Sequence, residues 1–404
     1  MTGNRHSGPL SDISVLDISE GIAGPFCSKL LADLGADVLK LEDPDQGDIS
    51  RTFGPFPDGI TEGDASGTYV YTNTSKRSVT VRLGTDAGRD LLFRLLATHD
   101  VVVASEPEGV LAARRFGYED LRRVNPGAVL TTVTGFGSDG PYAGFAATHL
   151  IHCAMGAWAN TCGLADREPL QAGGNLTDFI AGAYGAVATL AAVEQRAGDG
   201  LGQHVDVSAV EATITAALLP SLIYEYAGAL PERNSARATG PSFMMECIDG
   251  YVGVNVLTQP QWEALCMFVG MPELIEEPAY RTSPERLLLA GELRHRIAPF
   301  FRHRSAANVF HDAQMWRLPF GLVPSLTDVL SLEQHAAREF FVRIPHPSRP
   351  GETVPTPGVP FRMPASPSAP GPSPRLGEHT DEVLTNLLGL SRDEVAQLRA
   401  EGVC

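Results

Sequence analysis

Residues 14–41 read SVLDISEGIAGPFCSKLLADLGADVLKL, with a short aliphatic run at each end. The runs Ser14–Ile18 and Ala36–Leu41 have the composition of strands. Pro25 stands where the first turn of a helix tolerates proline, so we expect a helix from there to about Leu34. Strands joined by a helix pair in parallel through a right-handed crossover. This stretch therefore predicts the first βαβ unit of an open, Rossmann-like sheet.

The same alternation continues through the first half of the chain. We expect further strands at Val79–Leu83, Val101–Val103, Val129–Val133 and His204–Val207. Thr85 is expected to cap one helix, and a long helix rich in Ala and Gly is expected over Phe179–Gln195. The predicted fold class is α/β, with a Rossmann-like large domain over residues 1–225.

The pattern changes after about Tyr226. Asp249-Gly250, between Phe243–Ile248 and Tyr251–Val256, is typical of a hairpin. Helical segments near Gln261–Val269 and Leu287–Phe301 follow. These features predict a smaller α+β domain over residues 226–330.

A proline-rich segment comes next, since residues 345–374 hold 11 of the 30 prolines. Such a segment forms neither a helix nor a central strand and is expected to run extended over a surface. Helical patterning resumes at Asp381–Leu388 and Ser391–Leu398, and Ser391 with Glu394 makes a capping box. We therefore interpret residues 331–404 as a strap and a return to the large domain.

Composition excludes several classes of protein. The chain has 48 acidic and 31 basic residues, a net charge of −17, and no basic stripe, so it is not expected to bind nucleic acid. The longest uncharged apolar run, Phe179–Val193, is shorter than the roughly 20 residues that span a bilayer. The start is polar, and the six cysteines form no CxxC pair. We expect a cytoplasmic protein with reduced thiols and no membrane contact.

The sequence GFGSDG at 135–140 matches the GxGxxG pattern and follows a strand. A dinucleotide site needs a helix to open there, but PYAG follows, which is typical of a loop. We interpret these glycines as a structural turn. P-loop, GxSxG and HExxH patterns are absent from the sequence.

Asp178 stands at the start of the most apolar helix, after GGNLT at 173–177. One interpretation is an N-cap whose carboxylate accepts backbone N–H groups. The other is a nucleophile, because a desolvated carboxylate beside small residues can approach a carbonyl carbon and form a covalent adduct. Position along the chain does not decide between them.

Other residues that could carry chemistry are two histidines and a few cations. His149 and His152 precede an apolar stretch, either as core histidines or as a general base or ligand contact. A metal site is not expected, because no third ligand stands at a useful spacing. Basic residues are scarce, so Lys76-Arg77, Arg82 and Arg114-Arg115 are either solvated surface groups or phosphate contacts.

Taken together and in order, several segments resemble the family III CoA-transferases, the carnitine and formyl-CoA transferase group. They are DISEGIAGP (17–25), LGADVLKLE (34–42), GDISR (47–51), SKRS (75–78), GFGSDGPY (135–142), GQHVDVS (202–208) and LGEHTDEVL (376–384). This resemblance implies a Rossmann-like large domain made from both chain ends, a smaller domain, and two identical subunits that interlock. It implies that Asp178 attacks an acyl-CoA thioester, giving an aspartyl-acyl anhydride and then aspartyl-CoA.

The resemblance also implies which residues contact the substrate. Coenzyme A, which is part of the substrate and not a resident cofactor, is expected to contact Ile22, Ala23, Val81, Arg82, Ser105, Arg114, Arg115, Thr148 and His149. The substrates are an acyl-CoA and a carboxylic acid, and no metal is required.

Two alternatives remain open. The family includes α-methylacyl-CoA racemases, which use an Asp and a His on opposite faces of the α-carbon. Their histidine falls on Thr148, with His149 one place later, which weakens that interpretation. Ser105-Glu106 replaces the Asn-Phe pair of the family, and this departure motivates a second alternative, a CoA-binding scaffold without turnover.

Overall fold

The computed structural model describes residues 8–57, 59, 63–217, 219–228, 233, 242–346 and 348–404. The chain divides into two compact units. The large unit holds residues 1–162, 169–222 and 339–404, and the small unit holds 163–168 and 223–338. The sequence placed the smaller domain at 226–330, whereas the small unit covers 223–338 and also includes the short segment 163–168.

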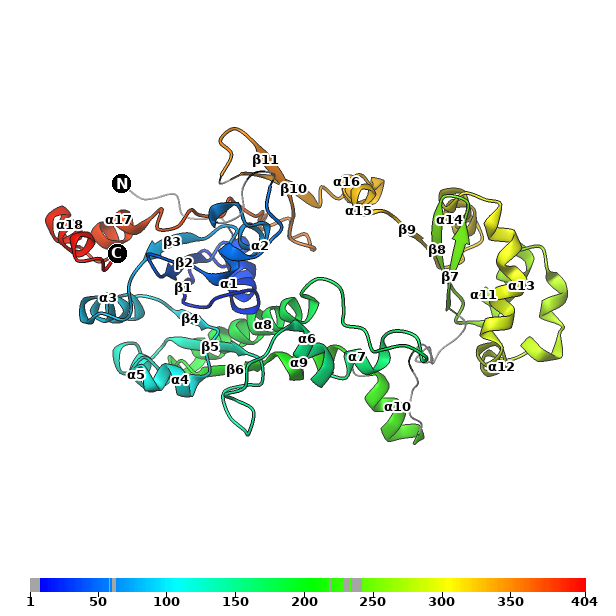
Figure 1. Cartoon of the computed structure of the whole chain (residues 1–404), viewed down its shortest axis with the longest axis horizontal. Coiled ribbons are helices and arrows are strands. Elements are labelled where there is room, and N and C mark those ends of the chain that lie inside the picture. Colours follow the sequence, from blue (N-terminus) through cyan, green and yellow to red (C-terminus); the bar gives the residue numbers. More distant parts are fainter. Residues whose placement is uncertain are drawn as a thin grey trace. The chain divides into compact units, whose positions relative to one another are not determined.

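Six parallel strands form the sheet of the large unit (Figure 1). In spatial order they are β3 (Arg77–Thr80), β2 (Asp37–Glu42), β1 (Ser14–Asp17), β4 (Val101–Ala104), β5 (Val129–Thr134) and β6 (His204–Ser208). Every neighbouring pair is parallel, with Val15 opposite Val38 on one side and Val101 on the other. This 3-2-1-4-5-6 order is that of the Rossmann fold, which confirms the predicted α/β class.

Alternate strand residues pack on opposite faces of the sheet. Val15 packs with α1 (Ala23–Asp33), α8 (Leu176–Asp199) and α9 (Ala209–Ala216), whereas Leu16 packs with α3 (Asp86–Leu96), α4 (Glu108–Ala113) and α5 (Tyr118–Val124). Because side chains along a strand alternate between faces, one sheet supports both helical layers. As expected, Thr85 caps α3 by accepting from the N–H of Gly88.

The end of the chain joins the same core. Val383, Leu384 and Val395 are buried against the α3 face of the sheet, and the C-terminal helices lie beside β3 (Figure 1). Here α17 (Thr380–Glu382) continues as a π-helical turn over Val383–Leu387, and α18 (Arg392–Ala400) begins with the expected Ser391/Glu394 capping box. At the start of the proline-rich segment, β10 (Phe341–Pro345) and β11 (Thr353–Pro357) pair as a separate two-stranded antiparallel sheet.

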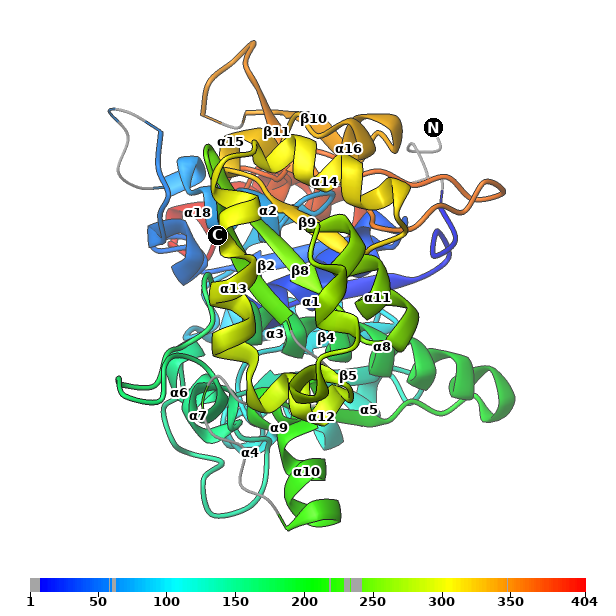
Figure 2. The same cartoon turned by 90° about the vertical axis from the view of Figure 1, so that its right-hand side faces the viewer.

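The small unit is an antiparallel sheet packed against helices (Figure 2). Its strands are β7 (Ser242–Cys247), β8 (Gly250–Asn255) and β9 (Phe320–Val323). Its helices are α11 (Gln259–Phe268), α12 (Ser283–Leu288), α13 (Ala290–Arg302), α14 (Ala306–Met315), α15 (Leu326–Val329) and α16 (Glu333–Ala337), with 3₁₀ turns at Pro272–Ile275 and Pro278–Tyr280. The hairpin was expected at this place, and the single helix expected over Leu287–Phe301 is instead two helices.

Four further helices of the described residues lie in the segments that join the elements given above. They are α2 (Gly67–Thr72), α6 (His149–Met155), α7 (Trp158–Thr161) and α10 (Leu219–Ala227), with 3₁₀ turns at Ile49–Thr52 and Gly63–Ala65. Helix α8 has 24 residues and a mean hydropathy of 1.5 over an 18-residue window, so by length and composition alone it is long enough to cross a membrane. In the structure it packs against α1, α9, β5 and β6.

Candidate active site

The carboxyl ends of β1 and β4 form the switch point of the sheet, where the strand order reverses. Ile22 and Ala23 follow β1 at the start of α1, and Ser105 follows β4. The hydroxyl of Ser105 accepts from the N–H of Glu20 at 2.9 Å, so the two loops are joined. Ligands of open α/β sheets bind in this crevice, and three of the expected CoA contacts lie beside it.

Buried charges hold the loop after β1 in place. Lys40 Nζ lies 2.7 Å from Asp48 Oδ2 and also donates to the carbonyl of Ser19, while Asp48 Oδ1 accepts from the N–H of Gly21 at 2.9 Å. Lys76 Nζ lies 2.9 Å from Asp17 Oδ2. All four charged side chains are fully buried, so each needs its partner. These charges thereby fix the loop of residues 19–21 at the carbonyl of Ser19 and the N–H of Gly21.

Asp17 shows how strongly these charges interact. Burial by itself would raise the pKa of this carboxyl, but Lys40 and Lys76 more than offset it and hold the pKa well below its usual range. Burial lowers the pKa of Lys76 to about 8. The carboxylate therefore stays ionised between the two lysines.

The other expected CoA contacts lie at separate places on the large unit. Val81 is buried just after β3, and Arg82 donates to the carbonyl of Gly402 and pairs with Asp45 at 2.8 Å. Arg114 pairs with Glu106 at 2.7 Å, and both side chains are exposed. Arg115 takes a left-handed backbone conformation with φ of 65°.

Helix α8 carries Asp178 to the carboxyl edge of the sheet. The last turn of the helix lies at the other edge, where Arg196 binds Asp100 and the carbonyl of Gly127, both just before strands. Twenty-four helical residues span about 36 Å, so the first turn of α8 extends to the edge that holds the switch point. Glycines allow this close approach, because a Cβ on Gly182 would lie 2.4 Å from the carbonyl oxygen of Ala23.

The N-cap interpretation of Asp178 is wrong. The capping residue is Asn175, and Asp178 is the third residue of the helix, with its N–H donated to the carbonyl of Asn175 at 3.1 Å. The helix begins three residues earlier than the sequence pattern indicated. The carboxylate of Asp178 is therefore free of the capping role and remains 16% exposed.

One histidine of α6, His152, contacts this carboxylate, and the other, His149, lies close enough to influence its pKa. His152 Nδ1 is 3.4 Å from Asp178 Oδ1 and 3.3 Å from the hydroxyl of Thr177. His149 does not contact Asp178 and binds Thr177 at 2.7 Å and the carbonyl of Ala172 at 2.8 Å. Thr148 precedes the helix and is exposed. The residue that reaches Asp178 is therefore His152, not Thr148 or His149.

Burial sets the proton affinities of this pair. Desolvation raises the pKa of Asp178 to about 6, which the nearby His149 and the helix N–H only partly oppose. Desolvation and His149 lower the pKa of His152 to about 4. At neutral pH the site therefore holds a poorly hydrated carboxylate beside a neutral imidazole. Such a carboxylate can act as a nucleophile toward a carbonyl carbon.

Two aromatic rings pack against Phe179, the residue of α8 that follows Asp178. Phe179 packs edge-on against Phe26 of α1, with ring centroids 4.9 Å apart, and against Tyr71 of α2 at 5.8 Å. These rings fix the start of α8 against the start of α1.

Two other sequence features resolve clearly. No helix opens at 135–140; Gly137 and Gly140 have positive φ, and Asp206 accepts from the N–H of Ser138, so these glycines form the predicted turn. Among the described residues no group of three His, Cys, Asp or Glu side chains could hold a metal ion.

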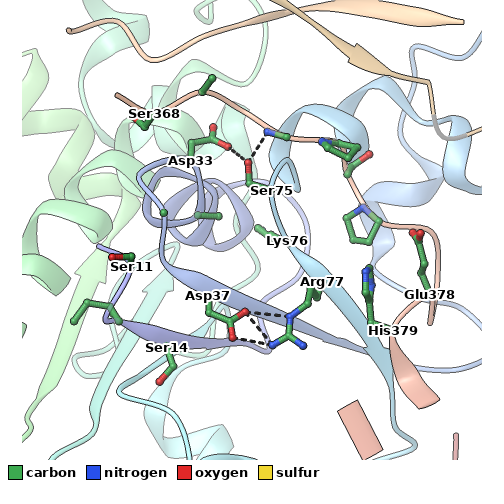
Figure 3. Close-up of a pocket in the computed structure, with 18 of the residues that line it drawn as sticks. Ser11, Ser14, Asp33, Asp37, Ser75, Lys76, Arg77, Ser368, Glu378 and His379 are labelled. Atoms are coloured by element: carbon green, nitrogen blue, oxygen red, sulfur yellow. Dashed lines mark hydrogen bonds and ion pairs between the residues drawn. The ribbon is translucent and has the colours of Figure 1, made fainter. Parts of the chain in front are cut away.

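A cavity of about 1460 Å³ lies elsewhere on the large unit (Figure 3). It is lined by residues at the amino ends of β1, β2 and β3, such as Ser14, Asp37 and Arg77, and by the proline-rich segment. Arg77 and Asp37 are paired at 2.8 Å within it. This is the sheet edge opposite Asp178, and the cavity includes none of the expected CoA contacts.

Sequence reasoning missed Thr177 and the buried ion cluster of Lys40, Asp17 and Asp48. It named His152 without a role. One signal was present, since His149 and His152 stand three apart and so share a helix face. The ion cluster was signalled only by charged residues inside two otherwise aliphatic strands.

Comparisons with known proteins agree with this fold and show the family. The family model described as CoA-transferase family III matches residues 10–380. The chain is 33% identical to the succinyl-CoA–D-citramalate CoA-transferase of Chloroflexus aurantiacus, over 100% of both chains. It is 31% identical to the succinate–glutarate CoA-transferase of Agrobacterium fabrum, over 95% of this chain and 97% of that one. A CAIB/BAIF family protein of Brucella suis superposes with a TM-score of 0.82 at 28% identity, covering 94% of this chain and 100% of that one.

Proposed function

Because this chain belongs to CoA-transferase family III, we propose that it moves CoA from an acyl-CoA donor to a carboxylic acid through covalent intermediates on Asp178. The observation that carries the proposal is the carboxylate of Asp178, which is desolvated, 16% exposed and free of the helix-capping role. A carboxylate in this state combines nucleophilicity with access to substrate.

The reaction proceeds in four steps. A carboxylate oxygen of Asp178 attacks the thioester carbonyl, expelling CoA thiolate and forming a mixed anhydride. The thiolate attacks the aspartyl carbonyl, which releases the donor acid and leaves an aspartyl-CoA thioester. The acceptor carboxylate attacks this thioester and again expels thiolate, which then attacks the acceptor acyl carbon and restores Asp178. Every step is acyl transfer, so no metal or organic cofactor is needed.

We place the CoA chain at the switch point, along Ile22, Ala23 and Ser105. The buried ion cluster supports this placement, because it fixes the loop that precedes Ile22. Arg82 and Arg115 remain the proposed contacts of the CoA phosphates. The names of the two relatives reported above point to dicarboxylic acids of four to five carbons as the acceptor class.

The racemase alternative fits this geometry less well. Two bases on opposite faces of an α-carbon each need to come within about 3 Å of it or its proton, which keeps the bases well apart. His152 Nδ1 and Asp178 Oδ1 are 3.4 Å apart and leave no room for a carbon between them. The scaffold alternative gives no reason for a desolvated carboxylate at this place.

The proposal includes a homodimer of interlocked subunits in the cytoplasm. Large apolar side chains on the large unit, including Leu150, Met155 and Val187, are each at least half exposed. A second copy that covers them would remove this apolar surface from water. Light scattering of the purified protein tests this part, and a monomer at micromolar concentration would refute it.

Incubation with isotopically labelled acyl-CoA tests the mechanism. We expect label on Asp178 by mass spectrometry, together with CoA exchange that requires an acceptor acid. Asp178→Ala should abolish both while leaving the circular dichroism spectrum unchanged. Deuterium incorporation at the α-carbon from heavy water would indicate a racemase, and neither adduct nor deuterium would indicate a scaffold.

A further inference from the structure

A chain of side chains leads from the backbone to the carboxylate of Asp178. His149 Nε2 is 2.8 Å from the carbonyl oxygen of Ala172, and His149 Nδ1 is 2.7 Å from the hydroxyl of Thr177. That hydroxyl is 3.3 Å from His152 Nδ1, which is 3.4 Å from Asp178 Oδ1. In each of these contacts one group must donate the hydrogen and the other must accept it, so the role of one group determines the role of the next.

The direction of the chain follows from its first member. A carbonyl oxygen can only accept, so His149 Nε2 carries the proton, and in the neutral ring Nδ1 is then an acceptor. The hydroxyl of Thr177, at 2.7 Å, is closer to this nitrogen than the N–H of Thr177 at 3.4 Å and donates its one proton there, which leaves its oxygen to accept from His152. His152 Nδ1 must therefore carry the proton. Cys153 Sγ also lies 3.7 Å from His149 Nε2, but the carbonyl oxygen at 2.8 Å still requires a proton on that nitrogen.

The other nitrogen of His152 does not oppose this assignment. His152 Nε2 is buried and has no hydrogen-bond partner within the described part of the chain. Burial also lowers the pKa of His152 to about 4, which keeps the ring neutral. Thr177 is fully buried, so water does not reorient its hydroxyl.

We infer that this chain fixes His152 as the Nδ1–H tautomer and makes it a positioning residue for Asp178, holding Oδ1 so that Oδ2 is the oxygen that attacks the thioester. The inference rests on the proposed function. The contact of 3.4 Å is long, as is common for catalytic contacts without substrate, and is expected to shorten when acyl-CoA fills the site. A neutral donor holds the carboxylate without neutralising it.

Matched variants separate this role from packing. His152→Leu and Thr177→Val remove the donor and the relaying hydroxyl, whereas His152→Asn and Thr177→Ser keep an N–H or O–H in place. Thr189→Val is the control, because Thr189 is a buried threonine of the same helix whose hydroxyl binds Thr131 and Gly185, away from the site.

The first readout is the rate of CoA release in a single turnover, with kcat and KM in steady state. We expect the Leu and Val variants to lose about tenfold or more in the acylation rate and in kcat, with KM changed little, as for loss of a hydrogen bond to a charged group. His152→Asn and Thr177→Ser should recover most of this loss, and Thr189→Val should show none. Wild-type acylation rates in His152→Leu or Thr177→Val would overturn the inference, as would equal loss in His152→Asn and His152→Leu.

The second readout is the tautomer itself, in the unmodified protein. Nitrogen-15 spectra of histidine-labelled protein should show His152 protonated at Nδ1 and His149 protonated at Nε2. An Nε2–H tautomer for His152 would overturn the inference even if every variant failed to fold. Failure of the proposed function is distinct from both outcomes, since wild-type protein would then form no adduct on Asp178.

Discussion

Gly182 of α8 faces the backbone of Ala23 in α1, and a Cβ on Gly182 would lie 2.4 Å from the carbonyl oxygen of Ala23. Asp178 stands one turn before Gly182 and shares its helix face. Because Gly182 has no side chain, α8 can pack closely against α1. This close packing places Asp178 near the start of α1, where CoA is proposed to bind. Backbone cannot yield to such a contact as a flexible side chain could.

Gly182→Ala tests this approach. The substitution should push α8 away from α1, lowering the free energy of unfolding by about 1–3 kcal/mol as overpacking does. It should also reduce kcat, because Asp178 moves with the helix. Gly198→Ala is the control, since it lies in the same helix with nothing within 4 Å of the added Cβ. It should be neutral or stabilising by up to about 1 kcal/mol. Urea unfolding and steady-state kinetics measure both, and equal behaviour of the two variants would contradict the prediction.

Asp178→Asn should remove activity and increase stability. Folding raises the pKa of Asp178 to about 6, so the ionised carboxylate is disfavoured in the folded state at pH 7.5. A neutral amide escapes this penalty, and the free energy of unfolding should rise by about 1–3 kcal/mol at that pH. The gain should vanish below about pH 4, where the carboxyl is protonated in both states. Loss of turnover should be at least about a thousandfold. Thermal unfolding of the wild type and the variant across this pH range measures the difference. A variant less stable than the wild type at pH 7.5 would count against the raised pKa of Asp178.

The acylation rate should depend on pH through the same group. Below about pH 6 Asp178 takes up a proton, and a neutral carboxyl does not attack a thioester, so the rate should fall about tenfold per pH unit. His152, with its pKa of about 4, stays neutral over this range. It therefore adds no second titration to the pH profile of the acylation rate above pH 5. Single-turnover release of CoA between pH 5 and 8 measures this, and a flat profile would exclude Asp178 as the titrating nucleophile.

Asp48 should matter for CoA binding through the loop after β1. Asp48→Ala leaves Lys40 without its close partner and the N–H of Gly21 without its acceptor. Removing one partner of a buried ion pair costs about 3–5 kcal/mol, so stability should fall. Asp48→Asn keeps the oxygen that accepts from the N–H of Gly21. This variant should also be less stable than the wild type, but it should lose less CoA affinity than Asp48→Ala does. Calorimetric titration with CoA compares the two variants, and equal affinities would show that the loop does not depend on Asp48.

Arg82 and Arg115 should contribute to binding of the CoA phosphates. Alanine at both positions should weaken CoA affinity about tenfold or more, as for loss of charged hydrogen bonds, and should lessen its dependence on salt. Arg122→Ala is the control, because Arg122 is an exposed arginine whose neighbour is Glu119 on the same helix. An unchanged dissociation constant in the double variant would refute these contacts.

Local sequence signals determined most of the secondary structure. Thr85 and Ser391 cap the helices that their side chains were expected to cap, because a cap depends on a few neighbouring backbone groups. The strands of the parallel sheet were expected within one or two residues, except at β3, which ends near Thr80 where Leu83 was expected. The family resemblance, an ordered set of such segments, was confirmed by the comparisons.

The state of Asp178 could be decided only by tertiary structure. Its position in the chain allowed a cap or a nucleophile, and the sequence pattern started the helix too late. His152, 26 residues earlier, reaches Asp178 only because α6 packs against α8. Hydrophobic periodicity and helix caps depend on residues that are close together in the sequence, so they can be predicted from it. Desolvation and charge pairing sum over segments that meet only after folding, so the proton affinity of this carboxylate exists only in the folded protein.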